Sequence, residues 1–388
     1  MFELSADQKQ ALAALIDWYQ NKRASKQYVT LGGYAGTGKT TLIGIFRKQL
    51  DQLDKKLKVG FASYTGKAAR VLQDALHQQK AVFRQDTVGT IHSLIYSPIV
   101  NEREEIVGWQ KKEKIDRQLI IIDEGSMVDG QIWQHLLSYH LPVVVVGDHG
   151  QLPPINGNFY LLQEPDLQLQ EIHRQARKNP IIGLSIQARE QGLIRSGNYS
   201  DSVRKFSQGD PDGQETMQEL LSSFTPDTLV LCGYNNTRRK LNHFMRAALG
   251  FETAGPTNGD RVICLRNNHQ QDIYNGMLGT IIGIESSEEG WYLAEIAMDG
   301  QEKPFKGLIS ARQFDSETPL NFTDKRSQIM RGDLFDFGYA LTVHKAQGSQ
   351  AKRVVLFEQR FKKMTELDWR RWLYTAVTRA QTELFIFP

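Results

Sequence analysis

A glycine-rich turn between a short apolar strand and a helix restricts the possible folds more than any other feature of the chain. The strand is predicted at residues 28–33, YVTLGG, and helical periodicity begins after Lys39. Between them, Gly33 to Thr40 form GYAGTGKT, a complete GxxxxGK[ST] match that we call the phosphate loop. Consecutive backbone N–H groups of such a turn, and the N-terminus of the helix after it, bind phosphates. An ordinary glycine-rich turn is the alternative, but the strand-to-helix context favours the phosphate site.

The phosphate loop predicts a nucleotide with a γ-phosphate, together with Mg²⁺. The side chain of Lys39 is expected to contact the β- and γ-phosphates, and the Thr40 hydroxyl is expected to join the ligands of Mg²⁺. We expect the nucleotide to be bound by Gly33, Ala35, Gly36, Thr37, Gly38, Lys39, Thr40 and Thr41.

Apolar strands that alternate with helices predict the fold class, α/β with parallel sheets covered on both faces. The strands VGFASYT, LIIIDE and LPVVVVGD complete a first lobe at residues 1–96 and 116–180. Residues 97–115 interrupt this lobe with β-prone flanks around the polar tip NEREE, which predicts a β-hairpin.

A second α/β lobe is predicted at residues 181–279 and 335–388, from DTLVLCGYN, YALTVHKAQGSQ, KRVVLFE and the final strand ELFIF. Short β-segments joined by Gly- and Glu-rich turns predict a small β-barrel inserted into it at residues 280–334. Since this lobe has no GxxxxGK[ST] turn of its own, a second nucleotide site is not expected.

Carboxylates and an amide follow two of the apolar strands in the first lobe. Asp123 can hold Mg²⁺ through water, and the adjacent Glu124 can take a proton from the attacking water. Asp148 and Gln151 follow the strand VVVVG. Because ligands bind beyond the carboxyl ends of parallel strands, these side chains should converge on the nucleotide, with Gln151 sensing the γ-phosphate. Alternatively, Asp148 only caps the next turn.

Three further side chains have two interpretations each on the residues alone. Gln8 completes the capping box Ser5-Ala-Asp-Gln, but an amide also pairs with the edge of adenine, and neither interpretation is favoured. Arg379, near the end of a helix, and Arg174 are either arginine fingers or surface arginines in salt bridges.

The composition argues against several other classes of protein. The formal net charge is only +3, which neither requires nor excludes nucleic acid as a partner. Cys232 and Cys264 lie far apart, so neither a disulfide framework nor a zinc site is expected. The sequence has no apolar run long enough to span a bilayer and no secretory signal, so we expect a cytoplasmic protein without membrane contact.

Eight motifs in order resemble those of the superfamily 1 helicases, and in detail those of the B subclass, the RecD and Dda type. They are GYAGTGKTT, FASYTGKAARVL, GTIHSLIY, IIIDEGSM, VVVVGDHGQLPPI, LQEIHRQ, YALTVHKAQGSQ and LYTAVTRA. The resemblance covers nearly the whole chain. It implies two RecA-like lobes with ATP bound between them, single-stranded DNA across both, and 5′→3′ translocation.

The resemblance also assigns roles to individual residues. It implies that Gln8 contacts adenine, that Gln151 and Gln347 contact the γ-phosphate, and that Arg174 and Arg379 are arginine fingers. The hairpin corresponds to the strand-separating pin of the family, and the β-segments correspond to its inserted barrel.

Three features depart from the family pattern. Gly125 stands where alanine is usual after the two carboxylates, and Gln350 replaces a frequent glutamate. The predicted hairpin is short, with Trp109 as its one large aromatic side chain.

Polar side chains in the loops at strand ends supply donors for DNA phosphates, which bind the strand without reading its sequence. Tyr96 and Trp109 either stack on bases, at about 1–3 kcal/mol each, or pack within the protein. The candidate DNA-binding residues are Ser63, Thr65, Lys67, Thr90, His92, Ser93 and Tyr96 in the first lobe, and Asn235, Asn236, Thr237, Arg238, His344 and Lys345 in the second.

The sequence therefore predicts an ATP-driven 5′→3′ DNA helicase of DNA repair, recombination or replication. We expect it to bind single-stranded DNA and its junctions with duplex as a monomer, with single-stranded-DNA-binding or replication proteins as further partners. A clamp or translocase that does not separate strands remains open, and so does an RNA remodeller, because contacts to the 2′-hydroxyl cannot be predicted from these loops. A nuclease is not expected, since no acidic cluster remains outside the ATPase motifs.

Overall fold

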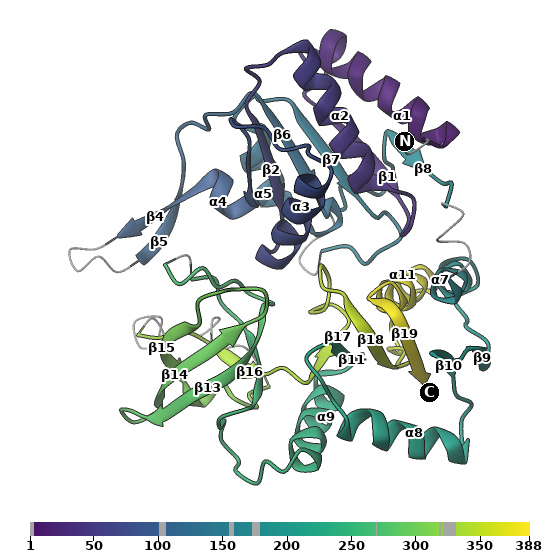
Figure 1. Ribbon diagram of the computed structural model, residues 1–388, viewed down its shortest axis with the longest axis vertical. Coiled ribbons are helices and arrows are strands. Elements are labelled where there is room, and N and C mark those ends of the chain that lie inside the picture. Colours follow the sequence, from purple (N-terminus) through teal and green to yellow (C-terminus); the bar gives the residue numbers. More distant parts are fainter. Residues whose placement is uncertain are drawn as a thin grey trace. The chain divides into compact units, whose positions relative to one another are not determined.

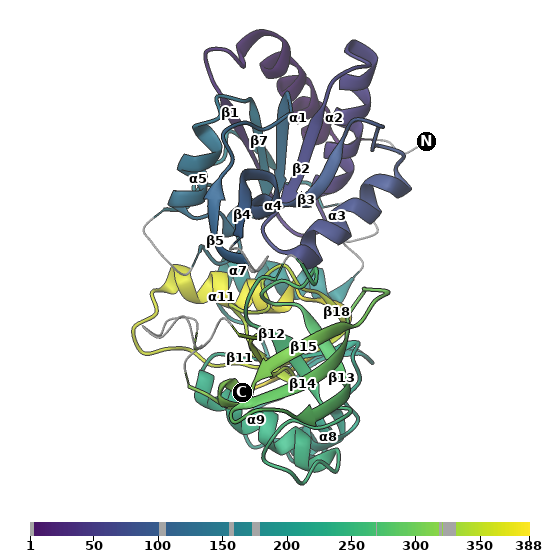
Figure 2. The ribbon, with the colours of Figure 1, turned by 90° about the vertical axis from the view of Figure 1, so that its left-hand side faces the viewer.

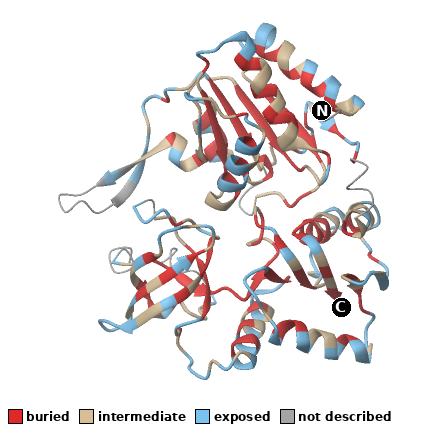
Figure 3. Ribbon diagram, in the orientation of Figure 1, coloured by how far each residue is buried: buried red, intermediate tan, exposed pale blue. Residues whose placement is uncertain are grey.

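The computed structural model describes residues 4–100, 106–154, 159–172, 179–268, 270–317, 320 and 331–388. By its internal contacts the chain divides into two compact units, Met1–Ile182 and Gly183–Pro388, called unit 1 and unit 2 below. Each unit contains a six-stranded sheet, and the strands of both sheets are largely buried (Figure 3).

The sheet of unit 1 is entirely parallel and has the strand order β3-β2-β6-β7-β1-β8 (Figure 1). Its strands are β1 (Tyr28–Gly33), β2 (Val59–Ser63), β3 (Thr87–Thr90), β6 (Leu119–Asp123), β7 (Val143–Gly147) and β8 (Leu167–Leu169). Continuous runs of valine, isoleucine and leucine suit strands that are buried on both faces. The predicted α/β class with a parallel-sheet core is confirmed.

Helices cover both faces of this sheet (Figure 2). One face packs against α1 (Ala6–Asp17), α2 (Lys39–Leu53) and α3 (Gly66–Gln78), and a short π-helical turn (Trp18–Lys22) extends α1. The other face packs against α4 (Ile91–Ile95) and α5 (Gly130–Leu137). A 3-10 turn (Gly125–Met127) follows β6.

A two-stranded antiparallel ribbon of β4 (Tyr96–Val100) and β5 (Ile106–Lys111) projects from the sheet of unit 1 (Figure 1). The expected tip at residues 101–105 lies outside the described residues. The strand pairing ends at Lys111, four residues before the predicted end of the hairpin at 115. The reason is that Ile115 turns back into the core that α4 and α5 form with the sheet.

The sheet of unit 2 has the order β17-β11-β18-β19-β10-β9, with only β9 antiparallel. Its strands are β9 (Gly197–Ser200), β10 (Val203–Lys205), β11 (Thr228–Cys232), β17 (Ala340–Thr342), β18 (Ala351–Phe357) and β19 (Ala380–Phe387). The helices assigned around it are α7 (Pro180–Gln191), α8 (Pro211–Ser222), α9 (Asn235–Ala248) and α11 (Glu366–Val377).

A separate five-stranded antiparallel sheet with its own apolar core lies within unit 2, in the order β15-β14-β13-β12-β16. Its elements are β12 (Arg261–Cys264), β13 (Leu278–Ser286), β14 (Trp291–Met298), β15 (Phe305–Ser310), a 3-10 turn (Ala311–Gln313) and β16 (Phe335–Phe337). The boundaries expected from the sequence, 280 and 334, therefore exclude two of its strands. Val262 of β12 and Phe335 of β16 pack in the same core as Ile296, and a short strand does not reveal its sheet.

Candidate functional site

The phosphate loop joins β1 to α2 and has the backbone that phosphate binding requires. Gly36 and Gly38 have φ angles of 79° and 75°, which glycine adopts without steric cost. The Lys39 ammonium donates hydrogen bonds to the carbonyl oxygens of Gly33, at 2.7 Å, and Tyr34, at 3.0 Å. These bonds hold the ammonium group within the turn, so the predicted phosphate-contacting lysine is already positioned.

Gln8 forms the expected capping box and also contacts the phosphate loop. Its side-chain oxygen accepts from the backbone N–H of Ser5 at 3.1 Å, which forms the expected capping box at the start of α1. Its amide nitrogen donates to the carbonyl oxygen of Thr37 in the phosphate loop at 2.9 Å. The cap therefore fixes the fully buried Gln8 against the phosphate loop, and its contact with adenine stays a prediction.

At the end of β6, the carboxyl group of Asp123 is harder to ionise than an exposed aspartate. Burial and the adjacent Glu124 charge raise the pKa of Asp123 to about 7, while Lys39 acts in the opposite direction. Glu124 itself has a left-handed backbone with φ of 55°, an uncommon conformation for this residue type that clusters at functional sites. Carboxylate and hydroxyl oxygens suit Mg²⁺, and a nearby divalent cation would favour the ionised form of Asp123, so Asp123 and Thr40 fit this ion.

Two glycines allow the loop after β6 to pack directly against the end of β7. A Cβ on Gly125 would lie 2.3 Å from Cγ1 of Val145, and a Cβ on Gly147 would lie 2.9 Å from the backbone nitrogen of Gly125. Alanine therefore does not fit at position 125 next to Val145. This close approach explains the departure from the family pattern and packs the loop after β6 against the end of β7.

The loop after β7 contains the predicted γ-phosphate sensor. The Asp148 carboxylate accepts from the backbone N–H of Gly150 at 2.9 Å and from the Gln151 amide at 3.4 Å, so Asp148 does cap this turn. The side-chain oxygen of Gln151 is buried and has no hydrogen-bond partner among the residues that the structure describes. A buried acceptor without a partner costs about 1–3 kcal/mol, which a donor such as a water molecule would recover.

Sequence reasoning missed a contact that links this loop to the phosphate loop. The rings of Tyr34 and His149 lie 4.3 Å apart between centroids. It also missed Asp7, whose carboxylate accepts from the backbone N–H groups of Gln170 and Glu171, both at 2.8 Å. The one sequence feature that could have pointed to Asp7 is its position next to Gln8.

In unit 2, Gln347 and Arg379 are both buried. The guanidinium of Arg379 donates to the carbonyl oxygens of Thr375, at 3.0 Å, and Ser349, at 3.2 Å. The surface salt bridge considered for this arginine is therefore wrong, because its partners are buried carbonyls. Arg174, the other candidate finger, lies outside the described residues.

The candidate DNA-binding residues of unit 1 lie where helices begin. The hydroxyls of Thr65 and Thr90 accept from the N–H groups of Ala68, at 3.2 Å, and Ser93, at 3.1 Å, as N-caps of α3 and α4. Both hydroxyls can still donate a hydrogen bond to a phosphate. Lys67 is half-buried in the first turn of α3, and Ser93 is exposed.

Tyr96 packs within the protein. Its hydroxyl lies 2.6 Å from Nδ1 of His135, and its ring lies 5.2 Å from that of His92. Burial lowers the pKa of His92, so this ring is neutral at pH 7 and can donate to a phosphate only as a neutral imidazole. Trp109 lies in β5 of the ribbon and is partly exposed.

Two candidate DNA-binding residues are not presented to solvent. Ser63 is fully buried and its hydroxyl donates to the carbonyl oxygen of Asp123 at 3.4 Å. Arg238 is buried and donates to the carboxylate of Asp336 at 3.0 Å. The structure does not support phosphate contacts for either residue.

The remaining candidates of unit 2 are accessible to different degrees. Asn235 and Asn236 are exposed at the start of α9, and the Thr237 hydroxyl accepts from the Gln359 amide at 3.0 Å. Burial lowers the pKa of His344, and burial with the charge of Arg238 lowers the pKa of Lys345 to about 8.

The described residues contain neither a clustered metal site nor a membrane-spanning helix. Within the described residues, no group of three or more histidine, cysteine, aspartate or glutamate side chains could hold a metal ion. No helix in the described part of the chain is both long enough and apolar enough to cross a membrane.

Comparison with known proteins gives family matches over both units. Residues 3–208 match the AAA domain family, and residues 337–387 match the UvrD-like helicase C-terminal domain. The chain is 28% identical to the ATP-dependent RecD2 DNA helicase of Deinococcus radiodurans, over 93% of this chain and 47% of that protein. It thus spans about half the length of that relative. It is 23% identical to the ATP-dependent DNA helicase Pif1 of Campylobacter jejuni, over 84% of this chain and 82% of that protein.

A solved structure has the same fold. The Pif1 helicase of Bacteroides, in complex with ADP-AlF3 and single-stranded DNA, aligns with a TM-score of 0.55 at 17% identity. The alignment covers 100% of this chain and 92% of that one.

Proposed function

Because the chain belongs to the B subclass of the superfamily 1 helicases, we propose that it is an ATP-dependent DNA helicase that translocates 5′→3′ and unwinds duplex DNA. One observation carries the proposal. The phosphate loop, the Asp123–Glu124 pair and the loop of Gln151 follow β1, β6 and β7, three neighbouring strands of one parallel sheet. Their carboxyl ends meet at one edge, which is where such sheets bind nucleotides.

The residues of unit 1 divide the work of ATP hydrolysis between them. Lys39 and the backbone N–H groups of the phosphate loop bind the phosphates, and Gln8 contacts adenine. Thr40 and Asp123 would hold Mg²⁺, which neutralises charge on the transferring phosphoryl group. Glu124 accepts the proton of the attacking water, while Gln151 orients that water at the γ-phosphate.

Unit 2 contributes to hydrolysis rather than to a second nucleotide site. We propose that Gln347 contacts the γ-phosphate and that Arg379, together with Arg174 of unit 1, stabilises the charge that develops on it. An arginine in this role is worth about 10³–10⁵ in rate. The buried carbonyl partners of Arg379 restrict its side chain before the reaction.

Loops of both units would hold single-stranded DNA through its phosphates. Thr65, Lys67, Thr90, His92 and Ser93 supply the donors of unit 1. The donors of unit 2 are Asn235, Asn236, Thr237, His344 and Lys345. Ser63 and Arg238 are left out because they are buried and donate to Asp123 and Asp336. Thr90 is also buried, but its hydroxyl accepts its hydrogen bond from the N–H of Ser93. The ribbon of β4 and β5 would separate the strands, and breaking one base-pair step costs only about 1.4 kcal/mol on average.

We further propose that the protein acts as a cytoplasmic monomer in DNA repair, recombination or replication. Single-stranded-DNA-binding or replication proteins are its proposed further partners.

Unwinding of matched duplexes that carry a single-stranded tail at either the 5′ or the 3′ end tests the proposal. We expect only the 5′-tailed duplex to open, only with ATP, and not with Lys39→Ala. Opening of the 3′-tailed duplex would contradict the polarity. If neither duplex opens while single-stranded DNA still stimulates ATP hydrolysis, the protein is a translocase or clamp and the ribbon is not a working pin.

A further inference from the structure

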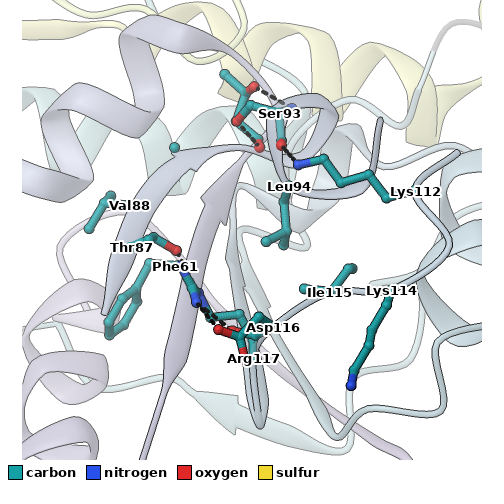
Figure 4. Close-up of a pocket in the computed structure, with 12 residues that line it drawn as sticks. Phe61, Thr87, Val88, Ser93, Leu94, Lys112, Lys114, Ile115, Asp116 and Arg117 are labelled. Atoms are coloured by element: carbon teal, nitrogen blue, oxygen red, sulfur yellow. Dashed lines mark hydrogen bonds and ion pairs between the residues drawn. The ribbon is translucent and has the colours of Figure 1, made fainter. Parts of the chain in front are cut away.

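A pocket of about 400 Å³ lies beside β3, the edge strand of the sheet in unit 1 (Figure 4). Val88, Leu94 and Ile115 give it an apolar lining, and Thr87 and Thr90 line it along the strand. Its volume is within the range of small-molecule binding sites. Thr90 and Ser93, proposed above as phosphate donors, contribute to its wall, and its other lining residues have no role so far.

The segment that follows β5 gives the pocket a positive charge. Lys112, Lys114 and Arg117 line it, against a single carboxylate, Asp116. That carboxylate is already paired with Lys58, at 2.9 Å, and this bond lowers the pKa of Asp116. The pocket therefore favours a ligand that combines an apolar group with a negative charge.

Two of the three cations are held by the protein, and the third extends toward solvent. Lys112 donates to the carbonyl oxygen of Ser93 at 2.7 Å, and Arg117 donates to the hydroxyl of Thr87 at 3.0 Å. Lys114 is exposed, and Figure 4 shows its side chain extending away from the pair of Arg117 and Asp116. Lys114 can therefore bind a phosphate at the rim without losing a structural contact.

The pocket extends beyond the proposed contacts of the tracked strand. The proposed donors for the tracked strand, such as Thr65 and Thr90, lie at the carboxyl ends of the strands. The pocket instead runs along β3, from Thr90 at its carboxyl end to Thr87 at its amino end. The chain that lines its other side, residues 112–117, comes directly from the ribbon of β4 and β5.

We propose that this pocket binds one unpaired nucleotide of the strand displaced at the base of the ribbon. The base would lie against Val88 and Leu94, and its phosphate would bind Lys114. Bases offer an apolar face whatever their sequence, and lysine binds phosphate as a point charge, so the site needs no particular sequence. The inference rests on the proposed helicase function and adds a second DNA-binding path to it.

Equilibrium binding without ATP tests the subsite separately from the motor. One substrate is a fork with two unpaired tails, and the other is the same duplex with only the 5′ tail. For Lys114→Ala, we expect the salt dependence of log K on the two-tailed fork to fall by about 1, the value of one lost phosphate contact. We expect wild-type affinity on the single-tailed duplex and wild-type ATP hydrolysis with single-stranded DNA.

Lys22→Ala is the matched control. Lys22 is also an exposed lysine of unit 1, but it lies shortly before β1, four strands away from β3 in the sheet. This variant should bind both substrates as the wild type does. A photoreactive base in the 3′ tail, next to the junction, should crosslink to residues 87–94 or 112–117.

The outcomes separate the subsite from the motor. An equal loss for Lys114→Ala on both substrates would overturn the assignment to the displaced strand. Wild-type binding of the fork by Lys114→Ala, with no crosslink to the pocket, would overturn the nucleotide subsite and leave an acidic protein segment as the ligand class. If the wild-type protein bound neither substrate, the proposed function itself would fail.

Discussion

The two six-stranded sheets differ in the loop that connects β1 to α2 in unit 1 and the loop that connects β11 to α9 in unit 2. In unit 1, residues 34–38 connect β1 to α2, and Gly36 and Gly38 give this loop two positive φ angles. In unit 2, only Gly233 and Tyr234 connect β11 to α9. The side chain of Gln359 already accepts from the N–H of Gly233, at 3.0 Å.

This difference shows how two similar sheets acquire different functions. The N–H group that could meet an anion in unit 2 is bonded within the unit, and the buried Arg238 that follows is paired with Asp336. We therefore propose that unit 1 binds the nucleotide and that unit 2 contributes side chains.

The largest effect is expected for Lys39→Ala. Removing this ammonium group should lower ATP hydrolysis by at least about 10²–10³-fold, since the charge on the phosphates loses a preorganised donor. Affinity for single-stranded DNA should stay near the wild-type value. Lys48→Ala, on the same helix α2, is the control and should hydrolyse ATP normally. Retained hydrolysis in Lys39→Ala would show that the phosphate loop is not the active site.

Buried ion pairs provide a stability test of the same comparison. The pair of Arg47 and Asp86 is buried in unit 1, and the pair of Arg246 and Asp260 is buried in unit 2. Asp86→Ala and Asp260→Ala should each lower the free energy of unfolding by about 3–5 kcal/mol, because a buried arginine is left unpaired. Hydrogen exchange should locate each loss in the unit that carries the substitution. If either substitution alone lowered the hydrogen-exchange protection of both units equally, the division into two compact units would be contradicted.

A smaller loss of stability is expected where the loop after β6 packs against β7. Gly125→Ala should lower the free energy of unfolding by about 1–3 kcal/mol, because the new methyl group meets Val145. Combining it with Val145→Ala, which removes the obstructing methyl groups, should cost less than the sum of the two single substitutions. Urea unfolding of all four proteins measures this coupling. Additive costs would show that the contact does not explain Gly125.

The smallest effect concerns pH. Because the pKa of Lys345 is lowered to about 8, its charge is present below that pH and is lost as pH rises through it. The groups that act on it are Arg238 and Asp336, and the neighbouring His344 is neutral over this range. The affinity for single-stranded DNA should therefore fall between pH 7 and pH 9, by about one phosphate contact.

Lys345→Arg provides the control for this pH dependence. Arginine stays protonated, so the variant should keep its affinity at pH 9. The same fall in affinity in both proteins would exclude Lys345 as a phosphate contact.

The sequence predicted those parts of the molecule that depend on neighbouring residues. The parallel-sheet core follows from runs of apolar residues, and the positive φ angles of Gly36 and Gly38 follow from the phosphate loop motif. The predictions for Ser63 and Arg238 failed because burial depends on distant partners. Ser63 bonds to Asp123, 60 residues away, and Arg238 bonds to Asp336, 98 residues away. No local pattern reveals such contacts.

We propose above all that unit 1 binds the nucleotide and that unit 2 accelerates its hydrolysis. The most direct test is the ATP hydrolysis rate of Arg379→Ala with saturating single-stranded DNA, measured beside its affinity for ATP. Because Arg379 also bonds to the carbonyls of Thr375 and Ser349, the thermal midpoint of the variant must first match that of Arg379→Lys. We predict a fall of about 10³-fold in kcat with ATP affinity within a few-fold of the wild type. A folded Arg379→Ala protein with wild-type kcat would contradict the claim.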